Sequence, residues 1–462
     1  MSVTAANAID RSVFGWAPPD WVVERIRNRF DEIVGGEWGD DPDANDEGVV
    51  IPVVRVADIR GLDVETEGLT LRRVKESKLS GRLVGDRTLL LEKSGGGEQR
   101  SVGRAVLARR LNVAAICSNF MAKTDCRSTM NPGYVAYLLD AAYSAGINTA
   151  HIQQTTGIQN LRVTDYLNTK VGMPPSLDQE RIAAYLDLSC AAIAAALTAK
   201  RAQIEGLASL RKATIQRAVT RGLNEQTGLR ATGDVWMSEI PSTWKLVSLK
   251  RISHTQTGLT LGKDYEGDLV ERPYLRVANV QDGHVSLEDV TRIDVPAAVA
   301  QRVTLRVDDV LMTEGGDLDK LGRGTIWNGE IADCLHQNHI FAIRCFKHKL
   351  LPTFLAYLTA SQYGRDYFEA TGKRTTNLAS TNSTKVGQFP IPRPPIVEQS
   401  EICQFLDDKL AELRRLVGTI EAQIDALTAY RKSLIHECVT GQRRITEADL
   451  NRVKAHAQTE AA

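Results

Sequence analysis

The sequence has no excess of charge of either sign, because 57 lysines and arginines balance 57 aspartates and glutamates. This balance excludes a basic field over the whole surface, so any surface that binds a nucleic acid must be local. The 7 cysteines are scattered and form no C-x-x-C pair, which argues against a dithiol redox motif. The residues that follow Met1 show no secretion pattern, so we expect reduced thiols and a cytoplasmic protein.

Long apolar runs and phosphate-binding loops are also missing. We expect no segment of the chain to be long and apolar enough to span a membrane. Glycine-rich segments occur at 94–97 and 315–316, but neither leads into the Gly-Lys-Ser/Thr of a phosphate-binding loop. Turn glycines that follow a strand explain both segments better.

Two partial motifs stop short of a catalytic or metal site. Residues 131–134, Asn-Pro-Gly-Tyr, approach a methyltransferase motif, but Gly133 replaces its second proline, and proline at a helix start explains the shared feature. Cys334, His336 and His339 have the spacing of metal ligands, yet the equivalent stretch 115–120 contains no histidine. We therefore predict no catalytic residue and no metal site in this chain.

The feature that dominates the sequence is a long repeat. Residues 174–220 recur without a gap as residues 394–440. Each copy begins with Pro-Pro, contains Arg-Lys near its end and closes with Val-Thr. Apolar residues recur every eleven positions in both copies, which indicates a long helix with one apolar face and little supercoil. Such a face needs a partner, and the other copy is the obvious one. The residues predicted to pair the two helices are Ile182, Ile193, Ile204, Ile215, Ile402, Leu413, Ile424 and Ile435.

The repeat extends beyond these helices. Trp21 matches Trp244, residues 52–59 match 273–280, and Gly103-Arg104 matches Gly322-Arg323. Residues 132–138 match 352–358, and Asn160-Leu161 matches Asn377-Leu378. Short β-branched and leucine runs alternate with turn residues between these matches, which predicts two α+β domains. The predicted parts are a lead-in (1–16), a first domain (17–173), a first helical region (174–222), a polar linker (223–238), a second domain (239–392), a second helical region (393–442) and a charged tail with no strong fold signal (443–462). One scaffold with two different faces suits a protein that contacts two halves of one elongated target.

These motifs resemble the specificity subunit of a type I restriction–modification enzyme. The resemblance rests on Ile-Pro-Ser-Thr-Trp at 240–244, Phe-Pro-Ile-Pro at 389–392, Pro-Pro-Ile-Val-Glu-Gln at 394–399 and Tyr-Arg-Lys-Ser-Leu-Ile at 430–435. The resemblance implies two target recognition domains separated by two long antiparallel coiled-coil helices. Each domain would read one half of a bipartite double-stranded DNA site. The helices would set the spacing and dock two methyltransferase subunits, and restriction or translocase subunits would join them.

The same resemblance implies that the chain is not itself an enzyme. S-adenosylmethionine, ATP and Mg would be used by the partner subunits, and we expect no cofactor in this chain. Basic and amide side chains clustered near glycine-rich turns are candidates for contact with phosphates and base edges. These DNA-binding candidates are Arg72, Arg73, Arg100, Arg104, Lys320, Arg323, Lys373, Arg374 and Asn377.

Two other functions are kept as alternatives. An orphan or fused DNA methyltransferase or nuclease would have to use one of the incomplete motifs, and Asn131 would then be essential. A structural protein whose helices only join two protein-binding domains would show no steep loss of DNA binding with salt.

Overall fold

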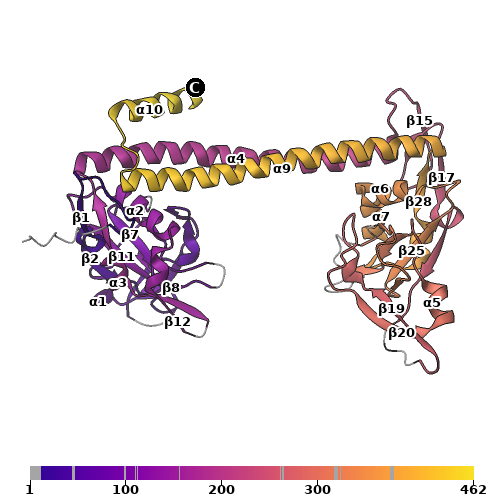
Figure 1. Ribbon diagram of the computed structural model, residues 1–462, viewed down its shortest axis with the longest axis horizontal. Coiled ribbons are helices and arrows are strands. Elements are labelled where there is room, and N and C mark those ends of the chain that lie inside the picture. The colour runs from indigo at the N-terminus through magenta and orange to yellow at the C-terminus, as the bar shows by residue number, and fades with distance from the viewer. Residues whose placement is uncertain are drawn as a thin grey trace, which may run out of the picture. The chain divides into compact units, whose positions relative to one another are not determined.

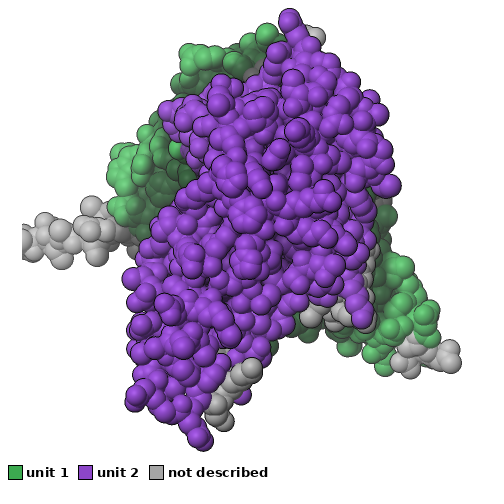
Figure 2. Space-filling view, turned by 90° about the vertical axis from the view of Figure 1, so that its right-hand side faces the viewer, with its two compact units in different colours: residues 1–200, 422–462 green, residues 201–421 purple. Residues whose placement is uncertain are grey.

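A computed structural model describes residues 12–43, 47–97, 100–109, 111, 113–155, 157–260, 262, 265–316, 321–322, 324–374 and 379–461. The chain divides into two compact units, coloured separately in Figure 2. Unit 1 comprises Met1–Lys200 and Ala422–Ala462, and unit 2 comprises Arg201–Glu421. Each unit therefore contains one α+β domain together with parts of both long helices, which are labelled α4 and α9 in Figure 1.

The domain of unit 1 is built from small sheets packed around one central strand. Strand β7 is buried along its whole length and lies within a four-stranded sheet. That sheet has the order β2 (Phe30–Gly35), β11 (Met121–Cys126), β7 (Thr88–Glu92) and β9 (Ala105–Leu107). A second sheet has the order β10 (Ile116–Cys117), β3 (Val49–Val54) and β6 (Thr70–Val74), and a third β12 (Ile152–Thr155), β13 (Ile158–Leu161) and β8 (Ser94–Gly95). The remaining pairs are β1 (Val22–Arg25) with β14 (Lys170–Met173) and β4 (Ile59–Arg60) with β5 (Asp63–Val64).

The helices of unit 1 cover these sheets and connect them. Helix α2 is the largest of the domain, and nine of its residues between Gly133 and Ala142 are buried. The helical segments are η1 (Ile26–Arg29), η2 (Val56–Asp58), α1 (Glu76–Leu79), α2 (Pro132–Ser144), η3 (Ile147–His151) and α3 (Val163–Leu167).

The domain of unit 2 repeats the three larger sheets and the terminal strand pair of this topology. In place of the β4–β5 pair, its described residues show an isolated bridge between Val280 and Val285. Its four-stranded sheet has the order β18 (Ser253–Thr257), β25 (Ile340–Cys345), β21 (Val310–Thr313) and β23 (Gly324–Ile326). One three-stranded sheet has the order β20 (Thr291–Pro296), β19 (Leu269–Leu275) and β24 (Leu335–His336). The other has the order β22 (Gly315–Gly316), β27 (Ala379–Ser380) and β26 (Lys373–Arg374). Strand β17 (Lys245–Ser248) pairs with β28 (Pro390–Arg393), as β1 pairs with β14. The helical segments are η4 (Leu249–Arg251), η5 (Val277–Asn279), α5 (Ala297–Val303), α6 (Pro352–Ala360), α7 (Gln362–Thr371) and α8 (Ser383–Gln388).

The long helices are α4 (Ser176–Arg221) and α9 (Ile396–Thr440). Both begin directly after a Pro-Pro pair and end at a glycine in the left-handed conformation, with φ of 74° at Gly222 and 76° at Gly441. A side chain at Gly222 would meet the Trp244 ring at 3.1 Å, and one at Gly441 would meet Pro18 at 2.4 Å. The two ends are therefore fixed by packing as well as by backbone conformation.

A buried glutamine attaches each long helix to its domain in the same way. The Gln179 side chain accepts a hydrogen bond from Asn131 N (3.1 Å) and donates one to Pro174 O (3.0 Å). The Gln399 side chain accepts from Leu351 N (2.9 Å) and donates to Pro394 O (3.0 Å) and Lys349 O (3.1 Å). Their exposed fractions are 1% and 0%, so these bonds satisfy polar groups that water does not reach.

The two long helices run antiparallel. In unit 1, the beginning of α4 shares a core with the end of α9, whereas in unit 2 the end of α4 packs near the beginning of α9. Of the predicted pairing residues, Ile182, Ile193 and Ile435 are buried in unit 1, and Ile215, Ile402 and Leu413 are buried in unit 2. Ile204 and Ile424 are only half-buried.

One expectation about α4 was wrong. By length and composition alone, α4 is apolar enough to cross a membrane. The reason is its alanine-rich stretch between Cys190 and Lys200, which adds apolar character on faces other than the predicted stripe. The stripe itself is accounted for by packing, since Leu186, Ile193 and Leu197 lie in the unit 1 core.

Two polar segments, the predicted tail and the predicted linker, contain secondary structure that was not predicted from the sequence. Residues 443–462, predicted to have no strong fold signal, contain α10 (Glu447–Ala461). A capping box begins this helix: Thr446 N donates to Asp449 Oδ2 (3.0 Å), and Asp449 N donates to Thr446 Oγ1 (3.2 Å). Leu450 and Val453 then pack against the unit 1 core. The predicted polar linker also contains a strand, β15 (Leu229–Ala231), which pairs with β16 (Glu239–Pro241).

Candidate nucleic-acid interface

A pocket of about 360 Å³ in unit 1 is the first part of the candidate interface. It is bounded by strand β8, the η2 turn, the segment after β2 and the turn before β11. Its lining residues are Trp38, Arg55, Val56, Ala57, Ser94, Gly95, Ser118, Asn119 and Phe120. Phe120 is 42% exposed and Asn119 beside it is also exposed, so an aromatic face is offered next to an amide group. This mixture suits the faces and polar edges of nucleic-acid bases.

The walls of this pocket are fixed by close backbone contacts. A Cβ atom added at Gly36 would lie 2.1 Å from Ser118 O, so only glycine fits under the turn that carries Asn119 and Phe120. On the η2 side, Arg55 N donates to Asp58 Oδ2 (2.8 Å) and the Arg55 guanidinium donates to Asp58 Oδ1 (2.7 Å). The hydrogen bond to Asp58 raises the pKa of Arg55 and keeps its charge at the pocket rim.

The β12–β13–β8 sheet adjoins the pocket, because Ser94 and Gly95 of β8 belong to both. Ser94 Oγ donates to Asn160 Oδ1 at 2.7 Å, which ties β8 to β13. On the outer strand, Gln153 and Gln154 are exposed. Glutamine side chains bond both donors and acceptors on base edges, so this strand is suited to sequence-dependent contacts.

Unit 2 builds the same surface with different side chains. Gly258 is the equivalent of Gly36, and a Cβ atom added at Gly258 would lie 1.9 Å from His336 O. In unit 2 the turn that corresponds to Ser118, Asn119 and Phe120 carries Gln337, Asn338 and His339, and it also precedes a central antiparallel strand. The middle asparagine is kept, and the residues on either side of it differ. The His339 ring contacts Glu314 Oε2 at 2.5 Å, where unit 1 has Phe120 and Lys93. The backbone is thus kept and the chemistry is changed.

The outer strands differ in the same manner. Gln153 lies opposite Asn160 in unit 1, and Lys373 lies opposite Ser380 in unit 2. Ser94 pairs with Asn160 and Gly315 pairs with Ser380, so Ser380 is the structural equivalent of Asn160. The sequence match of 160–161 to 377–378 is therefore wrong by three residues. A two-residue match carries too little information to set the register of a short hairpin.

Two of the predicted DNA-binding residues, Arg72 and Arg73, form hydrogen bonds within unit 1. Arg72 Nη2 donates to Gly39 O (3.1 Å), and its guanidinium lies 4.9 Å from the centre of the Trp38 ring. Arg73 donates to Gly48 O (3.2 Å) and Pro42 O (2.7 Å). Both side chains are half-buried, and these bonds hold the segment before β3 against β6. Their role in DNA binding stays a prediction.

Arg100 and Arg104 lie close in sequence but have different environments. Arg100 is exposed, whereas Arg104 Nε donates at 2.9 Å to Glu92, which is fully buried. Gly103 and Gly322 recur because both glycines adopt positive φ, 113° and 69°. A side chain there would meet Asn148 at 3.0 Å and Phe368 at 2.4 Å, respectively, so the repeated Gly-Arg pair has a backbone reason.

The remaining predicted residues lie in unit 2. Lys373 is exposed on β26, and Arg374 follows it on the same strand. Lys320, Arg323 and Asn377 lie outside the described residues. The predictions missed Gln153, Gln154 and the 118–120 and 337–339 turns. An alignment of β11 with β25 in the sequence would place these two turns at the same position and show which of their residues differ.

The two partial motifs have structural explanations. Asn131 is the N-cap of α2, and its side chain accepts a hydrogen bond from Tyr134 N at 3.0 Å. His336 is fully buried, with its Nδ1 2.9 Å from Ile340 O, while His339 points to Glu314. Within the described part of the chain, no group of three metal-ligating side chains comes together.

This geometry defines a class of protein: one that carries two copies of one α+β domain and presents an equivalent surface on each, with different side chains. In sequence, the chain is similar to type I restriction enzyme specificity subunits. It is 27% identical over 209 residues to the MjaX specificity subunit of Methanocaldococcus jannaschii, a match that covers 44% of this chain and 47% of that protein. It is 23% identical over 280 residues to the EcoKI specificity subunit of Escherichia coli, covering 58% of this chain and 55% of that protein. The chain thus spans about half the length of these curated relatives.

Solved structures extend the likeness in fold to nearly the whole chain. One is a chain from work on complex assembly and conformational transition of the type I R-M system, with a TM-score of 0.63. Another is the HsdS subunit from Thermoanaerobacter tengcongensis, with a TM-score of 0.54. Each is 16% identical and covers 92% of this chain and 98% of the other. No family model matches the chain. The resemblance to type I specificity subunits and the α+β fold with two repeated domains and two long antiparallel helices are confirmed.

Proposed function

We propose that this chain is the DNA sequence-recognition subunit of a type I restriction–modification complex, and that each domain reads one half of a bipartite DNA site. The observation that carries the proposal is the pair of equivalent surfaces. Gly36 and Gly258 keep the same backbone in both units. The exposed Phe120 of unit 1 is replaced by His339 in unit 2, and Gln153 on the outer strand is replaced by Lys373. A surface that keeps its frame and changes its polar groups is what reading two different sequences requires.

The long helices have two tasks in this proposal: they set the spacing of the half-sites and they dock two methyltransferase subunits. Leu177 and Val397, at equivalent positions near the helix starts, are 64% and 70% exposed. Large aliphatic side chains exposed twice at equivalent positions favour a surface that a partner covers twice. Restriction or translocase subunits would join this core in the cytoplasm. S-adenosylmethionine, ATP and Mg would be used by those partners.

The chain itself is proposed to be non-catalytic. The alternative, an orphan or fused methyltransferase or nuclease, would need Asn131 as a catalytic amide. The Asn131 side chain instead caps α2, and its backbone N–H donates to the buried Gln179, so both groups have structural partners. These contacts favour the recognition subunit over the enzyme.

A reciprocal substitution on the outer strands tests the proposal. Gln153→Lys places the unit 2 residue in unit 1, and Lys373→Gln does the reverse. Each variant is expressed with its methylating partners, and methylated adenines are mapped across the genome. Each variant should alter the sequence preference of one half-site and leave the other half-site unchanged, because each domain reads independently. Lys250→Gln, on the exposed η4 turn, is the charge-matched control and should leave both half-sites unchanged.

Two results would contradict the proposal. One is methylation by the purified chain without partners, which would make it an enzyme. The other is a methylation map in which Gln153→Lys and Lys373→Gln change the same half-site.

A further inference from the structure

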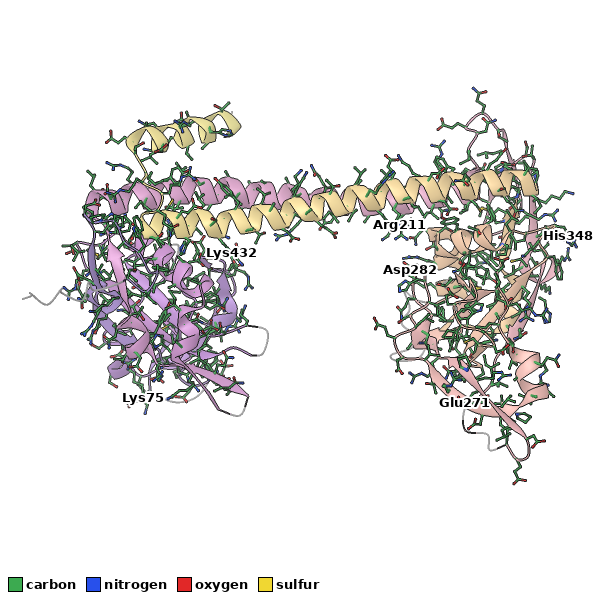
Figure 3. All side chains as sticks on the ribbon, in the orientation of Figure 1. Lys75, Arg211, Glu271, Asp282, His348 and Lys432 are labelled. Atoms are coloured by element: carbon green, nitrogen blue, oxygen red, sulfur yellow. The ribbon has the colours of Figure 1, made fainter. Side chains whose placement is uncertain are left out.

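A second cleft in unit 1 lies where the recognition domain meets the end of α9. Its volume is about 490 Å³, and it is lined by both parts. The domain contributes Arg100, Arg104 and Asp140, and α9 contributes Thr428, Arg431 and Lys432. In Figure 3, Lys432 lies on the same side of unit 1 as strands β8 and β12, which Figure 1 labels.

The charge of this cleft is predominantly positive. Among the described residues, no ion pair involves Arg100, Arg431 or Lys432, and Arg431 Nε is buried without a hydrogen-bond partner. Arg104 is paired with Glu92, but its Nη2 also lacks a partner. The one carboxyl group in the lining is Asp140; burial raises its pKa while Arg431 and Lys432 lower it, so it offsets part of this charge and leaves the cations in excess. A ligand with negative charge would complete the hydrogen bonding of both guanidinium groups.

The cleft and the candidate reading pocket are lined by residues that lie close together in the sequence. Ser94 and Gly95 line the reading pocket, and Arg100, Ser101 and Arg104 of the same connection line the cleft. An extended polyanion that meets the β8 edge can therefore reach both. A carboxylate on a folded partner protein would have no reason to follow this connection, so a phosphodiester of the bound duplex is the occupant that the geometry favours.

We propose that Arg431 and Lys432 of α9, with Arg100 of the recognition domain, bind a backbone phosphate of DNA next to the half-site read by unit 1. The inference rests on the proposed function. It assigns the long helix a direct contact with DNA in addition to its spacing role. Phosphate contacts of this kind position a protein on the duplex without reading sequence.

Unit 2 provides a natural comparison, because the Arg-Lys pair recurs on α4 as Arg211-Lys212. The equivalent cleft in unit 2 is smaller, about 250 Å³, and places Arg211 with Asp282 and Asp407. Figure 3 labels Arg211 and Asp282 on one side of unit 2. Two carboxylates and one arginine line this cleft, so its charge is less suited to a phosphate than that of the unit 1 cleft. The two Arg-Lys pairs should behave differently.

The test is a salt titration of duplex binding by the full chain. The probes are a duplex containing the mapped bipartite site and a random duplex of equal length. Arg431→Gln/Lys432→Gln should weaken binding to both duplexes by about tenfold for each lost phosphate contact at 0.1 M salt, and lower the log–log salt slope by about 0.9 per contact. The ratio between specific and random duplex should not change. The matched variant Arg211→Gln/Lys212→Gln should keep the wild-type slope.

A charge-preserving variant and a cross-link separate this effect from loss of folding. Arg431→Lys should retain most of the salt slope, and a photo-cross-linking amino acid in place of Thr428 should label the duplex. An unchanged slope in Arg431→Gln/Lys432→Gln, an equal loss in Arg211→Gln/Lys212→Gln, or a cross-link only to a protein partner would overturn the inference. A wild-type chain that prefers no bipartite duplex over random DNA would instead refute the proposed function, and the inference with it.

Discussion

His336 makes the stability of unit 2 dependent on pH. Its ring is fully buried beneath the 337–339 turn, with Nδ1 2.9 Å from Ile340 O and Nε2 3.3 Å from Gln256 Nε2. Nδ1–H donates a hydrogen bond to the Ile340 carbonyl and the Gln256 amide donates one to Nε2, so both ring nitrogens have their partners only while the ring is neutral. Burial lowers the pKa of His336 to about 4.

The direction of the effect follows from comparing the folded and unfolded states. An unfolded histidine titrates near pH 6.5, so below that pH the unfolded chain binds a proton that the folded chain excludes until about pH 4. The stability contributed by the neutral ring is complete above pH 6.5 and is lost as the pH falls. At about 1.4 kcal/mol for each pH unit, the loss between pH 7 and pH 4.5 is about 2.5 kcal/mol.

The repeat supplies the variant that removes this dependence. The positions of Gln256 and His336 are occupied in unit 1 by Val34 and Cys117, so Gln256→Val/His336→Cys transplants an apolar pair that the same scaffold already accepts. Urea unfolding of wild type and variant between pH 7 and pH 4.5 should show the variant gaining about 2.5 kcal/mol relative to wild type. His284→Gln, at an exposed ring, is the control. A difference between variant and wild type that stays constant within about 0.5 kcal/mol would refute the reasoning.

Two further predictions concern the scaffold. Gln179→Ala and Gln399→Ala should each lower the free energy of unfolding by about 2–4 kcal/mol, because each leaves buried backbone groups without partners, and thermal unfolding measures the loss. Gly206→Ala and Gly418→Ala should each stabilise the chain by about 1 kcal/mol, since nothing lies within 4 Å of the added methyl group and alanine favours a helix. Gly222→Ala, where φ is 74° and Trp244 is close, should destabilise it instead; a gain in melting temperature there would contradict the packing argument.

The repeated fold was readable from the sequence because the scaffold positions are under strong physical constraint. Gln179 and Gln399 must both bond buried backbone groups, and Gly103 and Gly322 must both adopt positive φ, so these residues recur and reveal the duplication. The eleven-residue spacing predicted the long helices for a similar reason, since an apolar face needs regular placement.

The candidate site was harder to predict, because the residues that differ between the copies produce no repeat signal. Composition drew attention to Arg72 and Arg73, whose guanidinium groups bond backbone carbonyls through contacts between residues distant in sequence. Gln153 and Lys373 were not paired because only the strand register shows that they occupy equivalent positions. The helix α10 was missed because its capping box is short and its apolar face holds few residues.

The glycines beneath the reading turns have a consequence for how such a protein acquires new specificity. Gly36 and Gly258 pack closely against the backbone of the turns, and the exposed Phe120 and His339 of these turns belong to neither core. Substitutions at positions such as Phe120 or His339 therefore carry a small folding cost, because both side chains are exposed. Substitutions that change the recognised DNA sequence can therefore accumulate at these positions one at a time, with little loss in the free energy of unfolding that limits mutation elsewhere in the chain.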